Sequence, residues 1–337
     1  MQSMEHESMN AEQKKSALID LMSTTSLELT PGGAAQIADF SQIVRRGCTI
    51  YVTFLPGSDF AETMNTVRRL QAEGYHPVPH FAARSIPSAA VLGENLAALQ
   101  GETGITEGLI IGGGVDRPVG DFSASIEILR TGLFEKYGFT EIGLAGHPEG
   151  SPDISAADCA QAIKEKNDYA RDTDMRLYLA TQFVFEAQPV LDWERMIREQ
   201  GNRLPIHVGI PGLATIKTLL RHAQNCGVGP SMRFLTRKPM DMLRLGFKDT
   251  FLGRHINAPD SDPSQLICDL LAGIHADSDC LIRRCHLYPL GGFKRTAAWM
   301  HQVQDGHFEF SGRGFNLAQS TLNDPAKRGL QGPNYLK

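Results

Sequence analysis

The stretch Arg176-Leu177-Tyr178-Leu179-Ala180-Thr181-Gln182-Phe183-Val184-Phe185-Glu186 decides the fold. Its apolar and aromatic run is typical of a strand buried on both faces, as the strands of parallel sheets are. Pro189 opens a helical segment soon afterwards. Ligands of parallel α/β proteins bind at the carboxyl ends of the strands. We therefore expect Thr181 and Gln182, which close this strand, to lie at a binding site, although Gln182 could also simply cap a loop.

The same alternation of a short apolar run and a helical segment recurs along the chain. It predicts strands at residues 26–30, 49–54, 77–81, 108–112, 141–146, 176–181, 205–210 and 284–289. It predicts helices at residues 34–46, 60–74, 88–99, 122–135, 155–171, 189–200, 214–225 and 294–302, with extra helices at 232–245 and 263–276 before strand eight.

Eight strand–helix units without a dividing linker favour an α/β protein with one (β/α)8 TIM barrel, which we place at residues 23–303. A doubly wound open sheet is the alternative. It usually has a Gly-rich first turn, whereas Gly112-Gly113-Gly114 follows the fourth predicted strand and does not have the GxGxxG spacing.

Composition sets the class of protein. The 337 residues suffice for a barrel, which commonly takes about 250 residues. A hydrophobic fraction of 42% and a charged fraction of 21% are ordinary for a globular chain, and a net charge of -5 argues against nucleic-acid binding. No apolar run approaches the roughly 18 residues needed to span a membrane. The six cysteines lack CxxC spacing, so we expect reduced thiols in a cytoplasmic protein.

The two ends of the chain differ from the predicted barrel. Residues 1–22 begin with a polar segment that lacks the apolar core of a signal peptide, and we expect a flexible leader there. Residues 304–337 are rich in Gly, Asn and Gln and show no clear period. We expect this segment to be a tail that wraps the barrel or frays.

Polar side chains gather at the predicted strand ends, which converge on one mouth in a barrel. They are Glu28, Thr53, His80, Asp116, His147, Glu149, Gln182 and Tyr288. Such groups are costly to place together unless a ligand uses them. Glu28, His80 and Asp116 would be acceptable metal ligands, but no HxH or HxxxH pair supports a metal site, and we expect none.

In this order and spacing the strand ends resemble the methylenetetrahydrofolate reductase family, whose members are flavin-dependent barrel enzymes. The resemblance covers roughly residues 23–303. It rests on Leu27-Glu28-Leu29 before Pro31, Val52-Thr53-Phe54, Pro79-His80, Asp116, Pro148-Glu149, Thr181-Gln182-Phe183-Val184-Phe185, Ile210-Pro211-Gly212 and His286-Leu287-Tyr288.

The resemblance implies FAD-dependent reduction of 5,10-methylenetetrahydrofolate to 5-methyltetrahydrofolate by ping-pong hydride transfer, with NADH or NADPH as donor. It implies that Glu28 is the acid that opens the methylene bridge, and that Asp116 stabilises the resulting cation. Gln182 and Tyr288, with Glu28 and Asp116, would bind the folate. The residues implied to bind FAD are Thr53, His80, Asp116, His147, Ser151, Lys164, Lys166 and Thr181.

Each of these residues also has an ordinary structural interpretation. Glu28 could form a strand-end salt bridge, Asp116 could cap a turn, and His80 could be a structural histidine. Lys164 and Lys166 stand two apart on a predicted helix, so they do not share a face, and solvated helix lysines are common.

The chain also departs from the family pattern around the cofactor. Gly114-Val115 precedes Asp116 where the family has Arg-Gly, and the segment after Pro211-Gly212 is shortened. Gly291-Gly292 follows Tyr288 where Asn-Arg is expected, with Lys294 and Arg295 a little later. The contacts to the flavin's diphosphate and adenine are therefore kept less well than the catalytic residues.

Two other functions stay open at this stage. One is a folate oxidoreductase that uses a donor other than NADH. The other is a flavin-free, folate-binding paralogue that serves as a subunit or regulator of a methyltransferase. Glu28, Asp116 and Gln182 together favour the enzyme, because a binding protein needs no positioned acid. The expected partners are small molecules rather than nucleic acid or a membrane, and a homo-oligomer is compatible with the sequence.

Overall fold

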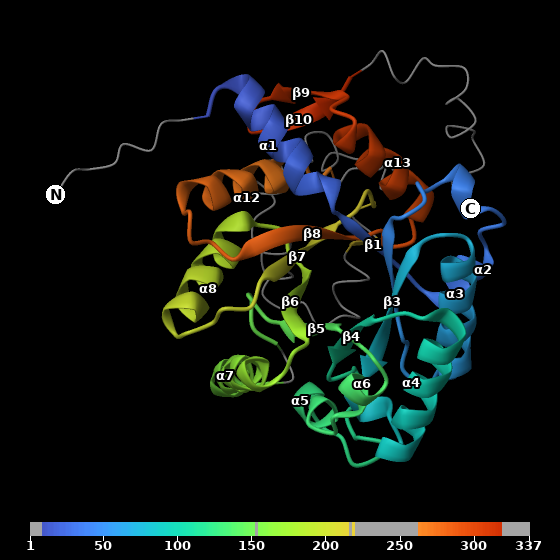
Figure 1. Ribbon diagram of the computed structural model, residues 1–337. Helices are drawn as coiled ribbons and strands as arrows, with labels where there is room; N and C mark the ends of the chain where they lie inside the picture. Colours follow the sequence, from blue (N-terminus) through green and yellow to red (C-terminus); the bar gives the residue numbers. More distant parts are fainter. Residues whose placement is uncertain (1–8, 152–153, 216–217, 220–261, 319–337) are drawn as a thin grey trace.

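A computed structural model describes residues 9–151, 154–215, 218–219 and 262–318. Within these residues eight parallel strands close into a barrel in chain order, with the last strand pairing back onto the first (Figure 1). The predicted (β/α)8 barrel is confirmed. The strands are β1 (Ser26–Leu29), β2 (Thr49–Val52), β3 (His76–Ala82), β4 (Glu107–Ile111), β5 (Glu141–Gly146), β6 (Arg176–Phe183), β7 (Ile206–Pro211) and β8 (Ile282–Tyr288).

Helices connect the strands and surround the barrel (Figure 1). Those described are α2 (Pro31–Ala35), α3 (Phe60–Ala72), α4 (Ala89–Thr103), α5 (Ser125–Leu129), α6 (Leu133–Lys136), α7 (Ala156–Asp172), α8 (Ala187–Glu199), α12 (Ser264–Ala276) and α13 (Phe293–Gln304), with the 3-10 turns η1 (Phe40–Gln42) and η2 (Ala83–Ser85). The helix predicted at 232–245 lies outside the described residues, as does most of the one predicted at 214–225.

Two predicted helices differ from those observed. The helix expected at 34–46 ends at Ala35, because the Asp39 side chain accepts the Ser41 N–H at 2.9 Å and starts a separate 3-10 turn. The helix expected at 122–135 is divided into α5 and α6 at Gly132, whose φ of 67° is left-handed and cannot continue a helix.

The amino-terminal segment is more ordered than we expected. Residues 11–22 form most of helix α1 (Ala11–Ser23) rather than a flexible leader. Asn10 and Gln13 form a reciprocal capping box at its start. Leu18 and Met22 are fully buried, and α1 contacts α12 and α13. Apolar burial therefore holds this helix against the barrel.

The described part of the tail folds back onto the barrel. Strands β9 (Phe308–Ser311) and β10 (Gly314–Leu317) form an antiparallel hairpin beside α1 and α13 (Figure 1). The Phe315 ring stacks on Trp299 of α13 with ring centroids 5.8 Å apart. The tail thus covers the α12–α13 side of the barrel as far as residue 318.

The core has an outer layer and a barrel interior. Leu27 and Leu29 of β1 belong to the large cluster between strands and helices, so the alternate residue Glu28 points into the barrel. Tyr51 of β2 and Tyr178 of β6 lie on strands that are not neighbours, yet their hydroxyls touch, so this contact crosses the interior. Tyr178 also reaches Glu107, the first residue of β4. Side chains therefore fill the barrel toward the amino ends of its strands.

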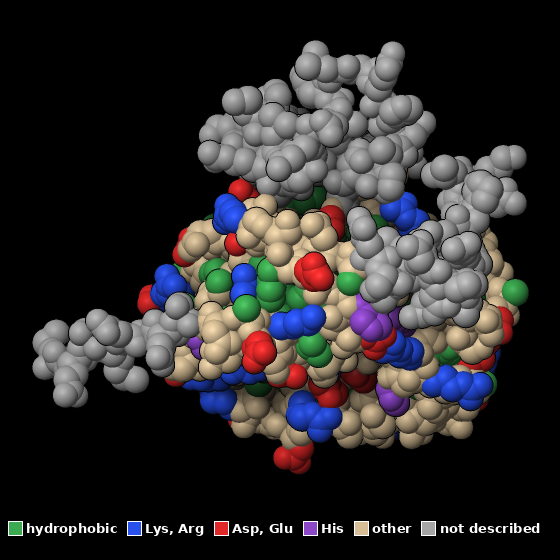
Figure 2. Space-filling model, turned by 90° about the horizontal axis from the view of Figure 1, so that it is seen from above, with side chains coloured by type: hydrophobic (Ala, Val, Ile, Leu, Met, Phe, Trp, Pro, Cys, Tyr) green, Lys and Arg blue, Asp and Glu red, His purple; other side chains and the backbone are tan. Residues whose placement is uncertain are grey.

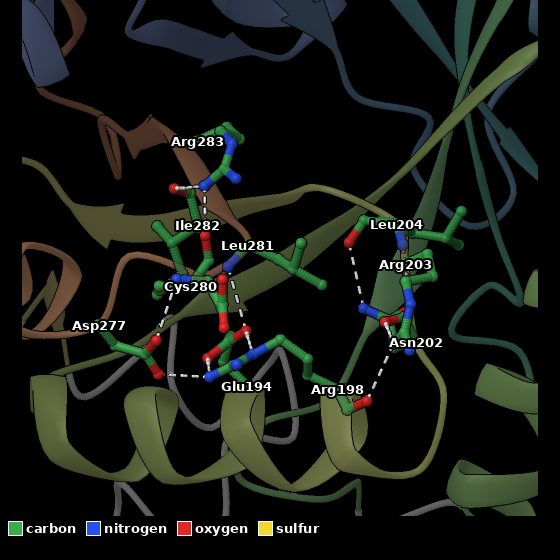
Figure 3. Close-up of polar contacts among 11 residues, drawn as sticks. Glu194, Arg198, Asn202, Arg203, Leu204, Asp277, Cys280, Leu281, Ile282 and Arg283 are labelled. Carbon is green, nitrogen blue, oxygen red and sulfur yellow. Dashed lines mark hydrogen bonds and ion pairs between the residues drawn. The ribbon is translucent and has the colours of Figure 1, made fainter. Parts of the chain in front are cut away.

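A polar network outside the barrel ties α8 to the segment that leads into β8 (Figure 3). Glu194, only 2% exposed, accepts from Arg198 Nε at 2.9 Å and from the Leu281 N–H at 3.1 Å. Arg198 also forms an ion pair with Asp277, which follows α12. The network fixes the start of β8, the strand that carries His286 and Tyr288.

Candidate active site

A cavity of about 1230 Å³ opens at the carboxyl ends of the strands. Polar side chains from β1, β3, β6 and β8 and from the segments that follow β2 and β5 line it together with apolar groups. Those named by the sequence analysis are Glu28, Thr53, His80, His147, Glu149, Ser151, Thr181, Gln182 and Tyr288. The structure thus brings most of the predicted site residues to one place, which is the position of active sites in this fold.

Glu28 projects from β1 toward two buried histidines. Its Oε2 lies 3.5 Å from Nε2 of His286 and 3.7 Å from Nε2 of His80. Burial by itself raises the pKa of the Glu28 carboxyl, but the hydrogen bond with His286 and the charges of both histidines outweigh it, and the pKa is lowered. Glu28 is therefore a carboxylate at neutral pH.

His286 is a site residue that the sequence analysis did not single out. Its Nδ1 lies 2.8 Å from Ser26 Oγ, which leaves Nε2 to face Glu28. The rings of Tyr51 and Tyr288 pack against it at centroid distances of 4.4 and 4.7 Å. The signal was available: with a period of two, Ser26 and Glu28 share the inner face of β1, as His286 and Tyr288 share that of β8.

His80 is buried, lines the cavity and makes no hydrogen bond through either ring nitrogen within the described residues. Burial lowers its pKa to about 4, despite the nearby Glu28 carboxylate. The ring is therefore neutral at pH 7. A buried polar group without a protein partner facing a cavity is a candidate contact for a ligand.

The end of β6 supplies Gln182 and Thr181, with different roles. Gln182 Oε1 accepts the Phe183 N–H at 3.0 Å, which orients the amide at the cavity wall. The Thr181 hydroxyl donates to Gln182 O and accepts from the Gly209 N–H, at 2.8 and 2.9 Å. Tyr288 donates to Thr181 O at 3.0 Å. Thr181 thus stabilises the irregular β6–β7 pairing, whereas Gln182 is placed to meet a ligand.

The other residues implied to bind FAD lie on the loop after β5 and on helix α7, and they do not come together. His147 lines the cavity, and burial together with the nearby Lys166 lowers its pKa to about 4. Lys166 lies behind this wall, 3% exposed, and donates from Nζ to Ala145 O at 2.6 Å. Burial lowers the Lys166 pKa to about 8. Lys164 points to solvent and pairs with Asp168, so neither lysine lines the cavity.

Asp116 is not brought to the cavity. It lies exposed on the loop between β4 and α5 and is absent from the cavity wall. The reason is that strand register fixes residues only up to Ile111, and four further loop residues separate Asp116 from that point.

Two arginines that we did not predict as site residues do line the cavity. Arg84 lies on η2, directly after β3, and Arg295 lies in the first turn of α13, after β8. Burial lowers the pKa of Arg295. Their position just after strand ends was the signal that could have identified them. They give the cavity positive charge on opposite sides of the barrel, near β4 and near β8.

Several wider findings bear on function. A scan against models of known protein families finds no match for this chain. Within the described residues, no cluster of three or more His, Cys, Asp or Glu side chains is arranged to hold a metal ion. None of the helices described is both long and apolar enough to cross a bilayer. On the face shown in Figure 2, positive and negative side chains are interspersed among the described residues.

Proposed function

We propose that this protein is a flavin-dependent reductase that converts 5,10-methylenetetrahydrofolate to 5-methyltetrahydrofolate, with NADH or NADPH as electron donor. The observation that carries the proposal is the Glu28 carboxylate held between His286 and His80 inside a large cavity at the strand ends. This arrangement in space supports the proposal independently of the order of the sequence motifs.

The size of the cavity supports two ligands. Sites for one drug-sized ligand commonly measure about 300–1,000 Å³. The 1230 Å³ observed here exceeds that range. A flavin ring and a pterin need such room if hydride is to pass directly between them, and a nicotinamide could use the same space in turn.

The wall fits the ring of a flavin. Leu109, Ile111 and Ala180 offer apolar surface, and His80 offers ring nitrogens that lack protein partners. Thr53 and His147 border the same space. Lys164 and Lys166, implied for the diphosphate, do not line it. FAD bound here would supply the hydride carrier between the nicotinamide and the folate.

The roles of the protein's own residues follow from their charges. Opening the methylene bridge creates an iminium cation, which the Glu28 carboxylate would stabilise. Because its lowered pKa leaves Glu28 without a proton, the proton needed for ring opening would pass from His286 through Glu28. Gln182 would hold the pterin by its amide. Asp116, exposed in the structure, is not assigned a step.

The test is an absorbance spectrum of the protein reconstituted with FAD, followed by anaerobic titration with NADH and then with methylenetetrahydrofolate. We expect NADH to bleach the flavin band and the folate to restore it. A bound flavin that only another reductant bleaches would change the donor. A protein that takes up no flavin but binds folate would overturn the reductase and favour the flavin-free paralogue.

Glu28→Gln separates the two half-reactions. We expect flavin reduction by NADH to stay near the wild-type rate while reoxidation by the folate falls by about a hundredfold or more, the scale of general acid–base catalysis. Glu94→Gln, an exposed carboxylate on α4, is the matched control and should change neither rate. Equal loss of both rates in Glu28→Gln would contradict the assigned role.

A further inference from the structure

Arg84 carries a positive charge in the cavity wall that no protein carboxylate balances within the described residues. Its Nε donates to Ser123 O at 3.3 Å and its Nη1 to Val115 O at 3.1 Å. Both acceptors are backbone carbonyls of the loop between β4 and α5. These two bonds fix the plane of the guanidinium, and Nη2 has no acceptor among the described residues. An arginine that is held in place but has no carboxylate partner is suited to bind an anion.

The backbone beside Arg84 carries no side chains, because three glycines follow one another there. A Cβ at Gly112 would lie 3.6 Å from Arg84 Nη2, so the guanidinium runs along a glycine surface. Gly113 has a left-handed φ of 94°, and a Cβ there would approach that of Ala82 to 3.2 Å. The N–H groups of Gly113 and Gly114 donate to no acceptor within the described residues. Both glycines line the cavity beside Arg84, and their N–H groups are not taken by protein acceptors in the described part of the chain.

We propose that Arg84 and the Gly112–Gly114 backbone form a subsite for a diphosphate group, supplied by the cofactor. A guanidinium with adjacent backbone N–H groups matches the oxygens of phosphate in geometry and charge. The inference rests on the proposed function for the source of the diphosphate, which FAD would bring. Because Lys164 and Lys166 do not line the cavity, Arg84 is the cation on the β4 side that can serve this group.

The alternative is that Arg84 only holds the loop between β4 and α5. Its backbone also joins that loop, with the Arg84 N–H donating to Gly112 O at 2.9 Å and the Val119 N–H donating to Arg84 O at 2.8 Å. A loop role affects every ligand of the cavity alike, whereas a diphosphate subsite affects only ligands that carry the anion. Affinity for FAD relative to riboflavin, which lacks phosphate, therefore separates the two roles.

The experiment measures dissociation constants of the full-length protein for FAD, riboflavin and inorganic pyrophosphate by fluorescence and calorimetry. The variant is Arg84→Gln, whose amide can still donate to a loop carbonyl but has no charge. We expect FAD affinity to fall about tenfold or more, the loss typical of one charge-assisted hydrogen bond, with riboflavin affinity within about twofold. The FAD affinity of the variant should also depend less on salt. Arg130→Met, at a surface ion pair with Glu165, is the control and should change neither.

Each outcome decides a different point. Equal weakening of FAD and riboflavin in Arg84→Gln, or no weakening of either, overturns the subsite. If the wild-type protein binds no flavin, the proposed function fails, and pyrophosphate then decides alone. Pyrophosphate binding that Arg84→Gln weakens keeps the subsite for another diphosphate ligand, and no pyrophosphate binding overturns it. If Arg84→Gln melts well below the wild type, Arg84→Lys is measured instead. Lysine keeps the charge but lacks the planar fork, so its FAD affinity should lie between that of the wild type and the tenfold weaker affinity expected for Arg84→Gln.

Discussion

The hydroxyl oxygens of Tyr51 and Tyr178 lie 2.5 Å apart inside the barrel, joining strands on opposite sides of it. Tyr178 continues the contact to Glu107 Oε1 at 2.9 Å. Burial is the main cause that raises the pKa of both phenols, so both stay neutral. The Tyr51 ring also lies 4.4 Å from His286 and 6.0 Å from His80. Tyr51, bonded to Tyr178, thus packs against the two histidines around Glu28.

The two hydroxyls of this pair should be energetically coupled. We expect Tyr178→Phe to lower the free energy of unfolding by about 1–3 kcal/mol, because the Tyr51 hydroxyl stays buried without its partner. Tyr51→Phe should cost less, because the Tyr178 hydroxyl keeps its bond to Glu107 Oε1, and the double variant should lose less than the sum of the two. Urea unfolding of the three variants measures this. Strictly additive losses would show that the two hydroxyls are not coupled.

Three histidines with lowered pKa values should make the fold sensitive to acid. Burial is the first cause that lowers the pKa of His80 and His147 to about 4 and that of His207 to about 3. Each is neutral when folded and takes up a proton on unfolding below about pH 6.5. The unfolded state therefore binds more protons between pH 6.5 and about 4, and stability falls as the pH falls through this window.

The slope is at most about 1.4 kcal/mol per pH unit for each histidine. Urea unfolding at several pH values between 7 and 4.5 measures it. His207→Gln should reduce the slope by the share of one histidine, because a glutamine takes up no proton on unfolding. An unchanged slope in this variant would mean that His207 is already protonated in the folded protein.

Much of this architecture was predictable because it depends on local patterns. Each barrel strand is an apolar run that has to be buried on both sides, and the strand end fixes the position of Glu28, His80 and Gln182 through register. Asn10 and Gln13, three residues apart, are also the sequence signal for the capping box of α1.

The residues that do not lie where we expected them are positioned by tertiary contacts, which a single sequence does not reveal. Asp116 lies beyond the last residue that register controls, on a loop that is bonded to Arg84 of η2. Lys164 and Lys166 were correctly expected on different faces of α7, but only the packed structure shows that Lys166 is the buried one. Charged groups on loops and helices are thus positioned by their partners, not by periodicity.

His286 should control the protonation of Glu28. Its hydrogen bond opposes the effect of burial on the Glu28 carboxyl, so we expect His286→Gln to raise the pKa of Glu28. The carboxyl carbon signal of Glu28 in a ¹³C-glutamate-labelled protein, assigned with Glu28→Gln, reports this pKa directly. His275→Gln, an exposed histidine on α12, is the control and should leave the titration unchanged. An unchanged Glu28 titration in His286→Gln would show that the hydrogen bond with His286 does not set the charge of Glu28.

Breaking the network around Glu194, drawn in Figure 3, should lower the free energy of unfolding more than breaking an exposed ion pair on α8. Replacing Glu194 by Leu leaves Arg198 and the Leu281 N–H without this acceptor, and we expect a loss of about 3–5 kcal/mol in unfolding free energy, as for a broken buried pair. Asp192→Asn on the same helix is the matched control. Its 3.7 Å pair with Arg195 is exposed, so the loss should stay below about 1 kcal/mol. Urea unfolding compares the two, and similar small losses would show that the start of β8 is held by packing rather than by this network.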